Sequence, residues 1–209
     1  MKKFLAFLGV TTTAFLFAWQ SHTHAAIKEP TASHKATVSD AYKELSPKLL
    51  AQGNNDFAYW ADICVNTVGK ESLDACQRAV DINPNEPLLW VNLGAEQGKV
   101  GQNQQSINSL DRALELEPNY SLAYYNKCII LANLTRHQEA AVACATAIDI
   151  DSNWGEASKA QAYNNLGVAL VDLNLYEQAL VAYGRALELN PNYDLARQNY
   201  NSLKDYLGK

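Results

Sequence analysis

The sequence is poor in histidine and in clustered positive charge. Four histidines occur in 209 residues, and 22 aspartates and glutamates outnumber 17 lysines and arginines, which gives a formal net charge of −5. The basic residues are scattered along the chain, so no positive field is available to hold a nucleic-acid backbone or an anionic membrane surface. We therefore expect no nucleic-acid partner.

The residue sets that usually support catalysis or metal binding are also missing. Two of the histidines, His22 and His24, lie near the N-terminus in a segment with the layout of an export signal, which leaves His34 and His137. Because no Cys-x-x-Cys pair occurs either, a zinc site, a histidine base and a redox dithiol all lack their usual residues. We predict that the protein is not an enzyme, that it has no catalytic or metal-binding residues, and that it needs no cofactor.

The N-terminus has the three parts of a secretory signal. Lys2 and Lys3 precede an apolar run over residues 4–19, and small residues follow at Ala25 and Ala26. That run of 16 residues is shorter than the roughly 20 that a membrane-spanning helix needs. We expect a signal peptide over residues 1–25 and a flexible, polar leader over residues 26–38. The short basic head favours export to a bacterial periplasm, and an uncleaved membrane anchor is the alternative.

One pattern then recurs through the chain. An aromatic residue opens the sequence W-x-x-L-G at residues 90–94 and the sequence Y-x-x-L-G at residues 163–167. A second apolar stretch follows each, with Ala-x-x-x-Tyr-x-x-Ala over residues 179–186, and Pro118 or Pro191 ends it. This pattern resembles the tetratricopeptide repeat (TPR), whose signature is an aromatic residue, a Leu-Gly pair, a later Ala-x-x-x-aromatic and a closing proline.

The resemblance implies an all-α, right-handed solenoid of about four TPR-like helical hairpins with a C-terminal capping helix. The domain is expected over residues 39–209, beginning with a short helix that covers the first repeat. The repeats are expected at about 57–86, 87–120, 121–154 and 155–193, and the capping helix at 194–207.

Two repeats depart from the usual length of 34 residues. Trp60 and Ala79 are 19 positions apart, whereas the equivalent residues of the next repeat are 23 apart, so about one helical turn is missing from the first hairpin. The spacing from Ala147 to Ala186 is 39 residues, which indicates an insertion. We expect the extra residues, around Trp154, to lengthen the start of the following helix.

The four cysteines occupy equivalent positions in two of the repeats. An even number of cysteines in an exported chain favours disulfides, and four allow three pairings. Cys64 and Cys128 stand where the other repeats have glycine, and Cys76 and Cys144 stand on the second helix of the same hairpins. The repeat register therefore implies the pairs Cys64–Cys76 and Cys128–Cys144. Four buried free thiols are the alternative.

The resemblance also implies a binding surface, because the first helices of successive TPR repeats line a concave groove in which peptides lie. An asparagine follows each opening aromatic by two positions, at Asn92, Asn126 and Asn165, and Asp62 stands there in the first repeat. Such a row of amides can hydrogen-bond the backbone of an extended peptide. The lysines and arginines with which TPR co-chaperones bind a C-terminal carboxylate are absent. The stripes predicted to line the groove hold Leu88, Val91, Ala95, Leu122, Tyr125, Ile129, Gln161, Asn164 and Val168.

These patterns predict an exported TPR scaffold or adaptor that binds a protein or peptide and assists the assembly of an envelope complex. Three alternatives remain at this point. The same scaffold is tethered to the inner membrane by an uncleaved N-terminus, or the chain is an exported enzyme or redox helper with an unrecognised site, or it is a secreted effector.

Overall fold

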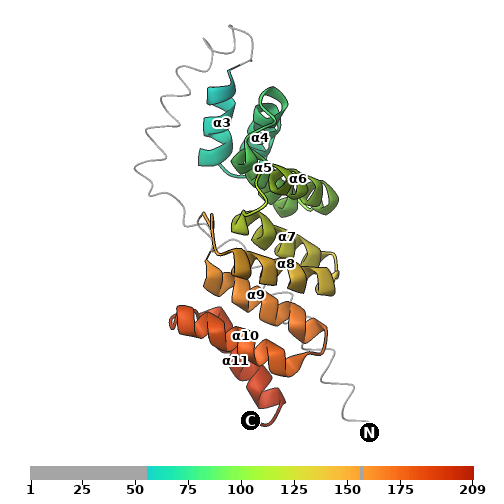
Figure 1. Ribbon diagram of the computed structural model, residues 1–209, viewed down its shortest axis with the longest axis vertical. Coiled ribbons are helices and arrows are strands. Elements are labelled where there is room, and N and C mark those ends of the chain that lie inside the picture. The colour runs from blue at the N-terminus through green and yellow to red at the C-terminus, as the bar shows by residue number, and fades with distance from the viewer. Residues whose placement is uncertain (1–55, 156–157) are drawn as a thin grey trace. The chain divides into compact units, whose positions relative to one another are not determined.

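The structure is a computed structural model that describes residues 56–155 and 158–209 (Figure 1). The described residues belong to one compact unit, residues 55–209. The predicted signal peptide, leader and first covering helix fall outside the described residues.

The described part of the chain contains nine helices and no strand, which confirms the predicted all-α class. The helices are α3 (Phe57–Asn66), α4 (Lys70–Ile82), α5 (Pro87–Lys99), α6 (Asn103–Leu116), α7 (Ser121–Asn133), α8 (His137–Ile150), α9 (Lys159–Asp172), α10 (Tyr176–Leu189) and α11 (Asp194–Tyr206).

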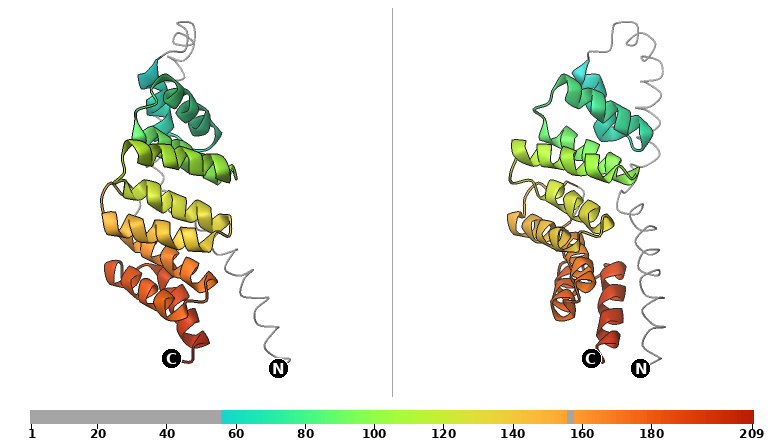
Figure 2. Two further views of the ribbon diagram at one scale, coloured as in Figure 1. Left: turned by 45° about the vertical axis from the view of Figure 1, so that its right-hand side comes forward. Right: turned by 90° about the vertical axis from the view of Figure 1, so that its right-hand side faces the viewer.

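The helices form a stack of hairpins within this unit. α3 packs on α4, α5 on α6, α7 on α8 and α9 on α10, and the second helix of each hairpin packs on the helix that follows it (Figure 2). The first helices also contact one another in the order α3, α5, α7 and α9. Side chains at equivalent positions on these four helices therefore form rows that cross from one repeat to the next.

One close contact recurs between the two helices of each hairpin, and it takes two chemical forms. In two hairpins a glycine faces a large side chain. A Cβ atom on Gly94 would lie 2.7 Å from Cγ of Leu110, and one on Gly167 would lie 2.5 Å from Cε1 of Tyr183. Only glycine permits the helices to approach this closely.

In the other two hairpins a disulfide occupies this position. Cys64 is bonded to Cys76 and Cys128 to Cys144, with Cα–Cα distances of 4.6 Å and 5.2 Å. All four residues are at most 2% exposed. The predicted pairing is confirmed, and both bonds join helices within a single hairpin.

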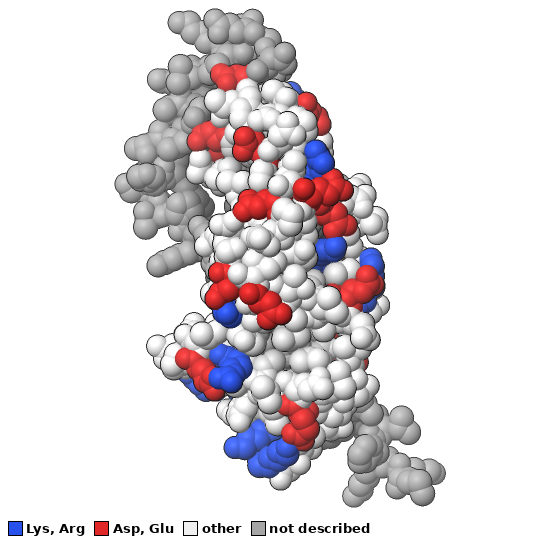
Figure 3. Space-filling view, viewed as in Figure 1, with Lys and Arg blue, Asp and Glu red and all other residues white. Residues whose placement is uncertain are grey.

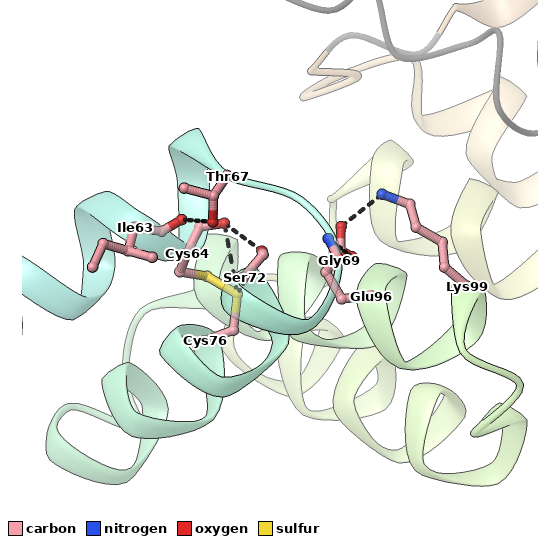
Figure 4. The surroundings of a disulfide bond; sticks show 8 residues. All are labelled: Ile63, Cys64, Thr67, Gly69, Ser72, Cys76, Glu96 and Lys99. Atoms are coloured by element: carbon pink, nitrogen blue, oxygen red, sulfur yellow. Dashed lines mark hydrogen bonds and ion pairs between the residues drawn. A yellow bond between two sulfur atoms is a disulfide. The ribbon is translucent and has the colours of Figure 1, made fainter. Parts of the chain in front are cut away.

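The shortened first hairpin is completed by a side chain from the second (Figure 4). α3 has 10 residues, whereas α5 has 13, and the chain turns at Gly69. The backbone N–H of Gly69 donates to Oε2 of Glu96 at 2.9 Å, and Nζ of Lys99 donates to Oε1 of the same carboxylate at 2.6 Å. Glu96 is buried, so this carboxylate satisfies a backbone donor that the missing helical turn leaves without a partner.

The insertion before the fourth hairpin does not lengthen its first helix, and that prediction was wrong. α9 begins only at Lys159, after the N-cap residue Ser158. Residues 151–155 instead run beside the start of α7, where the N–H of Ser121 donates to the carbonyl of Ser152 at 3.0 Å and the N–H of Leu122 donates to the carbonyl of Asn153 at 3.2 Å. Three residues of the insertion, at positions 151, 153 and 155, have positive φ angles, which a continuing helix excludes.

Candidate partner-binding surface

The predicted binding residues lie on α5, α7 and α9, three of the four first helices. We use the term first-helix face for the surface formed by α3, α5, α7 and α9 at the positions of the three predicted stripes and the asparagine row. These four helices contact one another in sequence, so the face extends over all four repeats.

The middle residue of each stripe is buried, which corrects the prediction for all three. Val91 is 0% exposed and Asn164 is 1% exposed, so neither side chain is available to a partner. Val91 belongs to the same core cluster as Ala123 and Ile130 of α7, because it lies at the contact between α5 and α7. Tyr125 is 9% exposed and is covered by the insertion.

The outer residues of the stripes remain accessible. Leu88 is 42% exposed. The side chains that are half-buried, and so still present atoms to solvent, are Ala95, Ile129, Val168, Leu122, Gln161, Asn92, Asn126 and Asn165.

The asparagine row divides into two halves with different roles. In the C-terminal half the amides bond to one another. Nδ2 of Asn199 donates to Oδ1 of Asn164 at 2.9 Å, and Nδ2 of Asn164 donates to Oδ1 of Asn165 at 3.3 Å. Asn165 also hydrogen-bonds the side chain of Tyr125. These bonds tie α9 to α7 on one side and to α11 on the other, so here the row is structural.

In the N-terminal half the amides are unused. Across residues 56–155 and 158–209, the side chains of Asn92 and Asn126 take part in no hydrogen bond. Asp62, which holds the same position on α3, accepts one hydrogen bond from Asn66 on its own helix at 2.7 Å. Asp62, Asn92 and Asn126 therefore form a row of polar groups on three adjacent helices, with unfilled hydrogen-bonding capacity.

The sequence did not predict Asn199 as a member of this row, although it follows Asn165 by the repeat length of 34 residues. The prediction required an aromatic residue two positions earlier, and Arg197 stands there. The repeat length alone was the signal that would have found it.

The insertion covers part of the first-helix face over α7. The Trp154 ring packs edge-on against the Tyr125 ring with 6.4 Å between centroids. Its indole N–H donates to Oδ1 of Asp151 at 3.0 Å, and Nζ of Lys159 bonds the other oxygen of that carboxylate at 2.9 Å. Leu122 packs against the same buried cluster as Trp154. Residues of the chain itself thus occupy the place at which a ligand was expected to contact Tyr125.

Burial at this point has an electrostatic consequence for two tyrosines. Desolvation raises the pKa of Tyr125 well above its usual range, and the nearby Tyr193 raises it further. Desolvation also raises the pKa of Tyr193 to about 12. Both hydroxyls therefore remain neutral at physiological pH.

Charge is distributed unevenly along the hairpin stack. Residues 56–95 contain six acidic and two basic residues, whereas residues 158–209 contain five of each. Figure 3 shows acidic side chains over the α3–α6 part of the molecule with few basic ones among them. Within the described residues no acidic side chain before Glu96 forms an ion pair, so these six carboxylates have no cationic partner in contact.

Two lysines near the asparagine row are already engaged. Nζ of Lys99 lies 2.6 Å from Glu96, and Nζ of Lys127 lies 2.5 Å from Asp111. Among the described residues, no three side chains of the kinds that bind metals come together, and none of the helices is long and apolar enough to span a membrane.

A shallow cavity of about 340 Å³ lies away from the predicted stripes, at the α10–α11 end of the stack. Leu180, Val181 and Gly184 of α10 and Tyr200 of α11 line it. Val181 is 64% exposed, so the cavity is an open notch at the surface and not an enclosed ligand site.

Comparisons with known proteins agree with the repeat pattern. Tetratricopeptide repeat family models match residues 91–157 and residues 160–193. A search of curated protein sequences finds no match.

Solved structures share the arrangement of helices. A crystal structure of MamA has a TM-score of 0.64 at 20% identity, over 78% of this chain and 95% of that one. MamA from residue 41 onward of Desulfovibrio magneticus RS-1 has a TM-score of 0.58 at 19% identity, over 81% and 85% of the two chains. The first TPR domain of Spaghetti (RPAP3), bound to the HSP90 peptide SRMEEVD, has a TM-score of 0.54 at 22% identity, over 59% of this chain and 94% of that one.

At such identities the likeness is one of fold. The two family matches establish the family, and the hairpin stack and the close contact inside each hairpin agree with them. This chain is a tetratricopeptide repeat protein.

Proposed function

We propose that this chain is an exported TPR scaffold that binds an extended segment of a partner protein on its first-helix face and assists the assembly of an envelope complex. The observation that carries the proposal is the pair Asn92 and Asn126. These two amides lie on adjacent helices and form no hydrogen bond within the described residues, and the exposed Leu88 precedes Asn92 by four positions on α5.

An unused amide suits the backbone of an extended peptide, because it offers one acceptor and two donors to the alternating C=O and N–H groups. Two such amides on adjacent helices would contact the backbone at two points irrespective of the peptide's side chains. Leu88 would add an apolar contact beside them.

Two disulfides support the exported location. Disulfides persist in oxidising compartments and are rare in the cytosol. Both bonds are buried in the hairpins, where they serve stability, and no described cysteine is left free.

Capture of a partner tests the binding role. Cross-linking in native envelope extract should yield a partner with the wild-type chain and lose it with Asn92→Ala/Asn126→Ala. Asn165 is left unchanged because it bonds Tyr125. The matched control is Asn108→Ala/Asn201→Ala, two exposed asparagines on α6 and α11. If the wild type and both double variants captured the partner equally, the first-helix face would not be the binding site. If the wild type captured no partner, the scaffold role would be contradicted.

The mass of the chain tests export. Expression of the full sequence in a bacterium should give a periplasmic protein that lacks about the first 25 residues, as the signal layout predicts. A full-length mass in the membrane fraction would favour the tethered form of the same scaffold.

A further inference from the structure

We propose that the bound segment is short and basic: it spans α3 to α7 only, and a lysine or arginine of the segment binds Asp62. This inference rests on the proposed function, because it names the chemistry of the ligand that occupies the same face. Two independent observations carry it, the closure of the face at α7 and the carboxylate of Asp62 on α3, which no described cation pairs with.

The face is closed at its C-terminal end by the chain's own side chains. Trp154 packs on Tyr125 and is fixed through Asp151, whose carboxylate also binds Lys159. On α9, which follows, Asn164 hydrogen-bonds Asn199 of α11, and Asn165 hydrogen-bonds Asn164 and Tyr125 of α7. A peptide that runs along the row from α3 is therefore blocked by the Trp154 side chain after Asn126. On α9 no amide of the row is left without a hydrogen bond.

The length of the open part follows from the helix spacing. Packed helices lie about 8–10 Å apart, so α3 and α7 are separated by roughly 20 Å. An extended chain covers about 3.3 Å per residue, which limits the contact to about six residues. This is a short linear segment and not a folded domain.

The charge of the open part is set by Asp62. Its carboxylate receives one hydrogen bond, from Asn66, and no described cation pairs with it. The nearby basic side chains are committed elsewhere, since Lys99 binds Glu96 and the Arg78 guanidinium lies 4.6 Å from the Trp60 ring centroid. A lysine or arginine of the ligand would form a charge-assisted hydrogen bond here.

Apolar side chains flank this carboxylate. Val65 follows Asp62 by three residues and so lies on the same side of α3, and it is 47% exposed. Leu88 on the adjacent helix is 42% exposed. The ligand therefore combines a basic residue at its α3 end with apolar residues that contact Val65 and Leu88.

A random 12-residue peptide library displayed on phage, selected on the full-length protein purified after export, tests the proposal. We expect selected peptides to be enriched in lysine or arginine next to an apolar residue. Truncation of a selected peptide should leave a minimal binding core of about six residues. Asp62→Asn should weaken that peptide by about two- to fivefold, the range for an exposed ion pair, and the effect should fall as salt rises.

Matched variants separate the possible outcomes. Asp74→Asn removes an exposed acidic charge from α4 and should leave the affinity for the peptide unchanged. If Asp74→Asn weakened binding as much as Asp62→Asn, the effect would come from the net charge of the protein, and the role of Asp62 would be wrong. A minimal core longer than ten residues would show that Trp154 does not limit the bound segment to α3–α7. Peptides that bind wild type but keep their affinity in Asn92→Ala/Asn126→Ala would contradict the proposed function itself.

Two further results are decisive. Peptides that require Asn92 and Asn126 but show no basic enrichment would leave the proposed function intact and overturn the charge inference alone. A dimer in light scattering that dissociates in Asn92→Ala/Asn126→Ala would assign the face to a second copy of this chain and overturn the peptide ligand.

Discussion

Two glycines of the fourth hairpin should respond in opposite directions to the same substitution. Gly167 lies on α9 and Gly184 on α10. A Cβ atom on Gly167 would lie 2.5 Å, 2.6 Å and 2.9 Å from three ring carbons of Tyr183, whereas the nearest described atom to a Cβ on Gly184 is 3.9 Å away. Both residues are helical, so alanine is compatible with the backbone at each.

The magnitudes follow from two opposing effects. Alanine in a helix interior gains about 0.5–1 kcal/mol over glycine. At Gly184 nothing opposes this gain, so Gly184→Ala should raise the free energy of unfolding by that amount. At Gly167 the ring of Tyr183 is 1% exposed and cannot move aside into solvent. Overpacking costs about 1–3 kcal/mol, which leaves Gly167→Ala with a net loss of up to about 2.5 kcal/mol.

Urea unfolding followed by circular dichroism at the helical band measures both variants against wild type. The order of midpoints should be Gly184→Ala, then wild type, then Gly167→Ala. Because repeat arrays can unfold in more than one step, the comparison uses the transition of the C-terminal hairpins wherever two are resolved. A Gly167→Ala protein as stable as Gly184→Ala would refute the account of close helix approach in these hairpins.

The remaining predictions concern the disulfides, one carboxylate and the last helix. Iodoacetamide should add no groups to the cysteines without reductant. Cys128→Ser/Cys144→Ser should lower the free energy of unfolding by about 3 kcal/mol, as expected for a loop of 16 residues. A variant as stable as wild type would show that the disulfide contributes nothing to stability. Burial raises the pKa of Asp172, opposed in part by His137. Its ionised form therefore costs stability once the pH rises past its unfolded-state pKa, and Asp172→Asn should raise the melting temperature at pH 7 with a gain that disappears on acidification below both pKa values. A gain that persists at low pH would contradict this assignment. Deletion of residues 194–209 removes Leu203 from its cluster with Tyr183, so the truncated chain should aggregate in light scattering, and a soluble monomer would contradict the capping role of α11.

The disulfides could be predicted because the repeat register fixes which positions of a hairpin face each other. Cys64 and Cys128 stand where glycine stands in the other repeats, and that position faces the second helix in every repeat. Local sequence and family geometry together were sufficient, since no contact between distant repeats was involved.

The binding face could be predicted only in part, because it depends on contacts between repeats. Nothing in the residues around Asn165 indicates that its partner is Tyr125, 40 positions earlier. The residues around Trp154 likewise do not indicate that its ring packs on Tyr125. The spacing reveals an insertion, but its path depends on left-handed backbone at Asp151 and Asn153 and on backbone donors that the start of α7 leaves free. Propensity alone favoured more helix.

The placement of the two disulfides has a mechanical consequence for the hairpin stack. Each bond closes a loop, with sequence separations of 12 and 16 residues, and these loops cannot lengthen when the chain is pulled from its ends. Together they withhold roughly 90 Å of contour length from a fully stretched molecule. Under tension, hairpins α5–α6 and α9–α10 would extend completely. Hairpins α3–α4 and α7–α8 would each keep a disulfide that joins their two helices. Two of the four hairpins therefore keep the contact between their two helices when the chain is stretched, and they can refold from it.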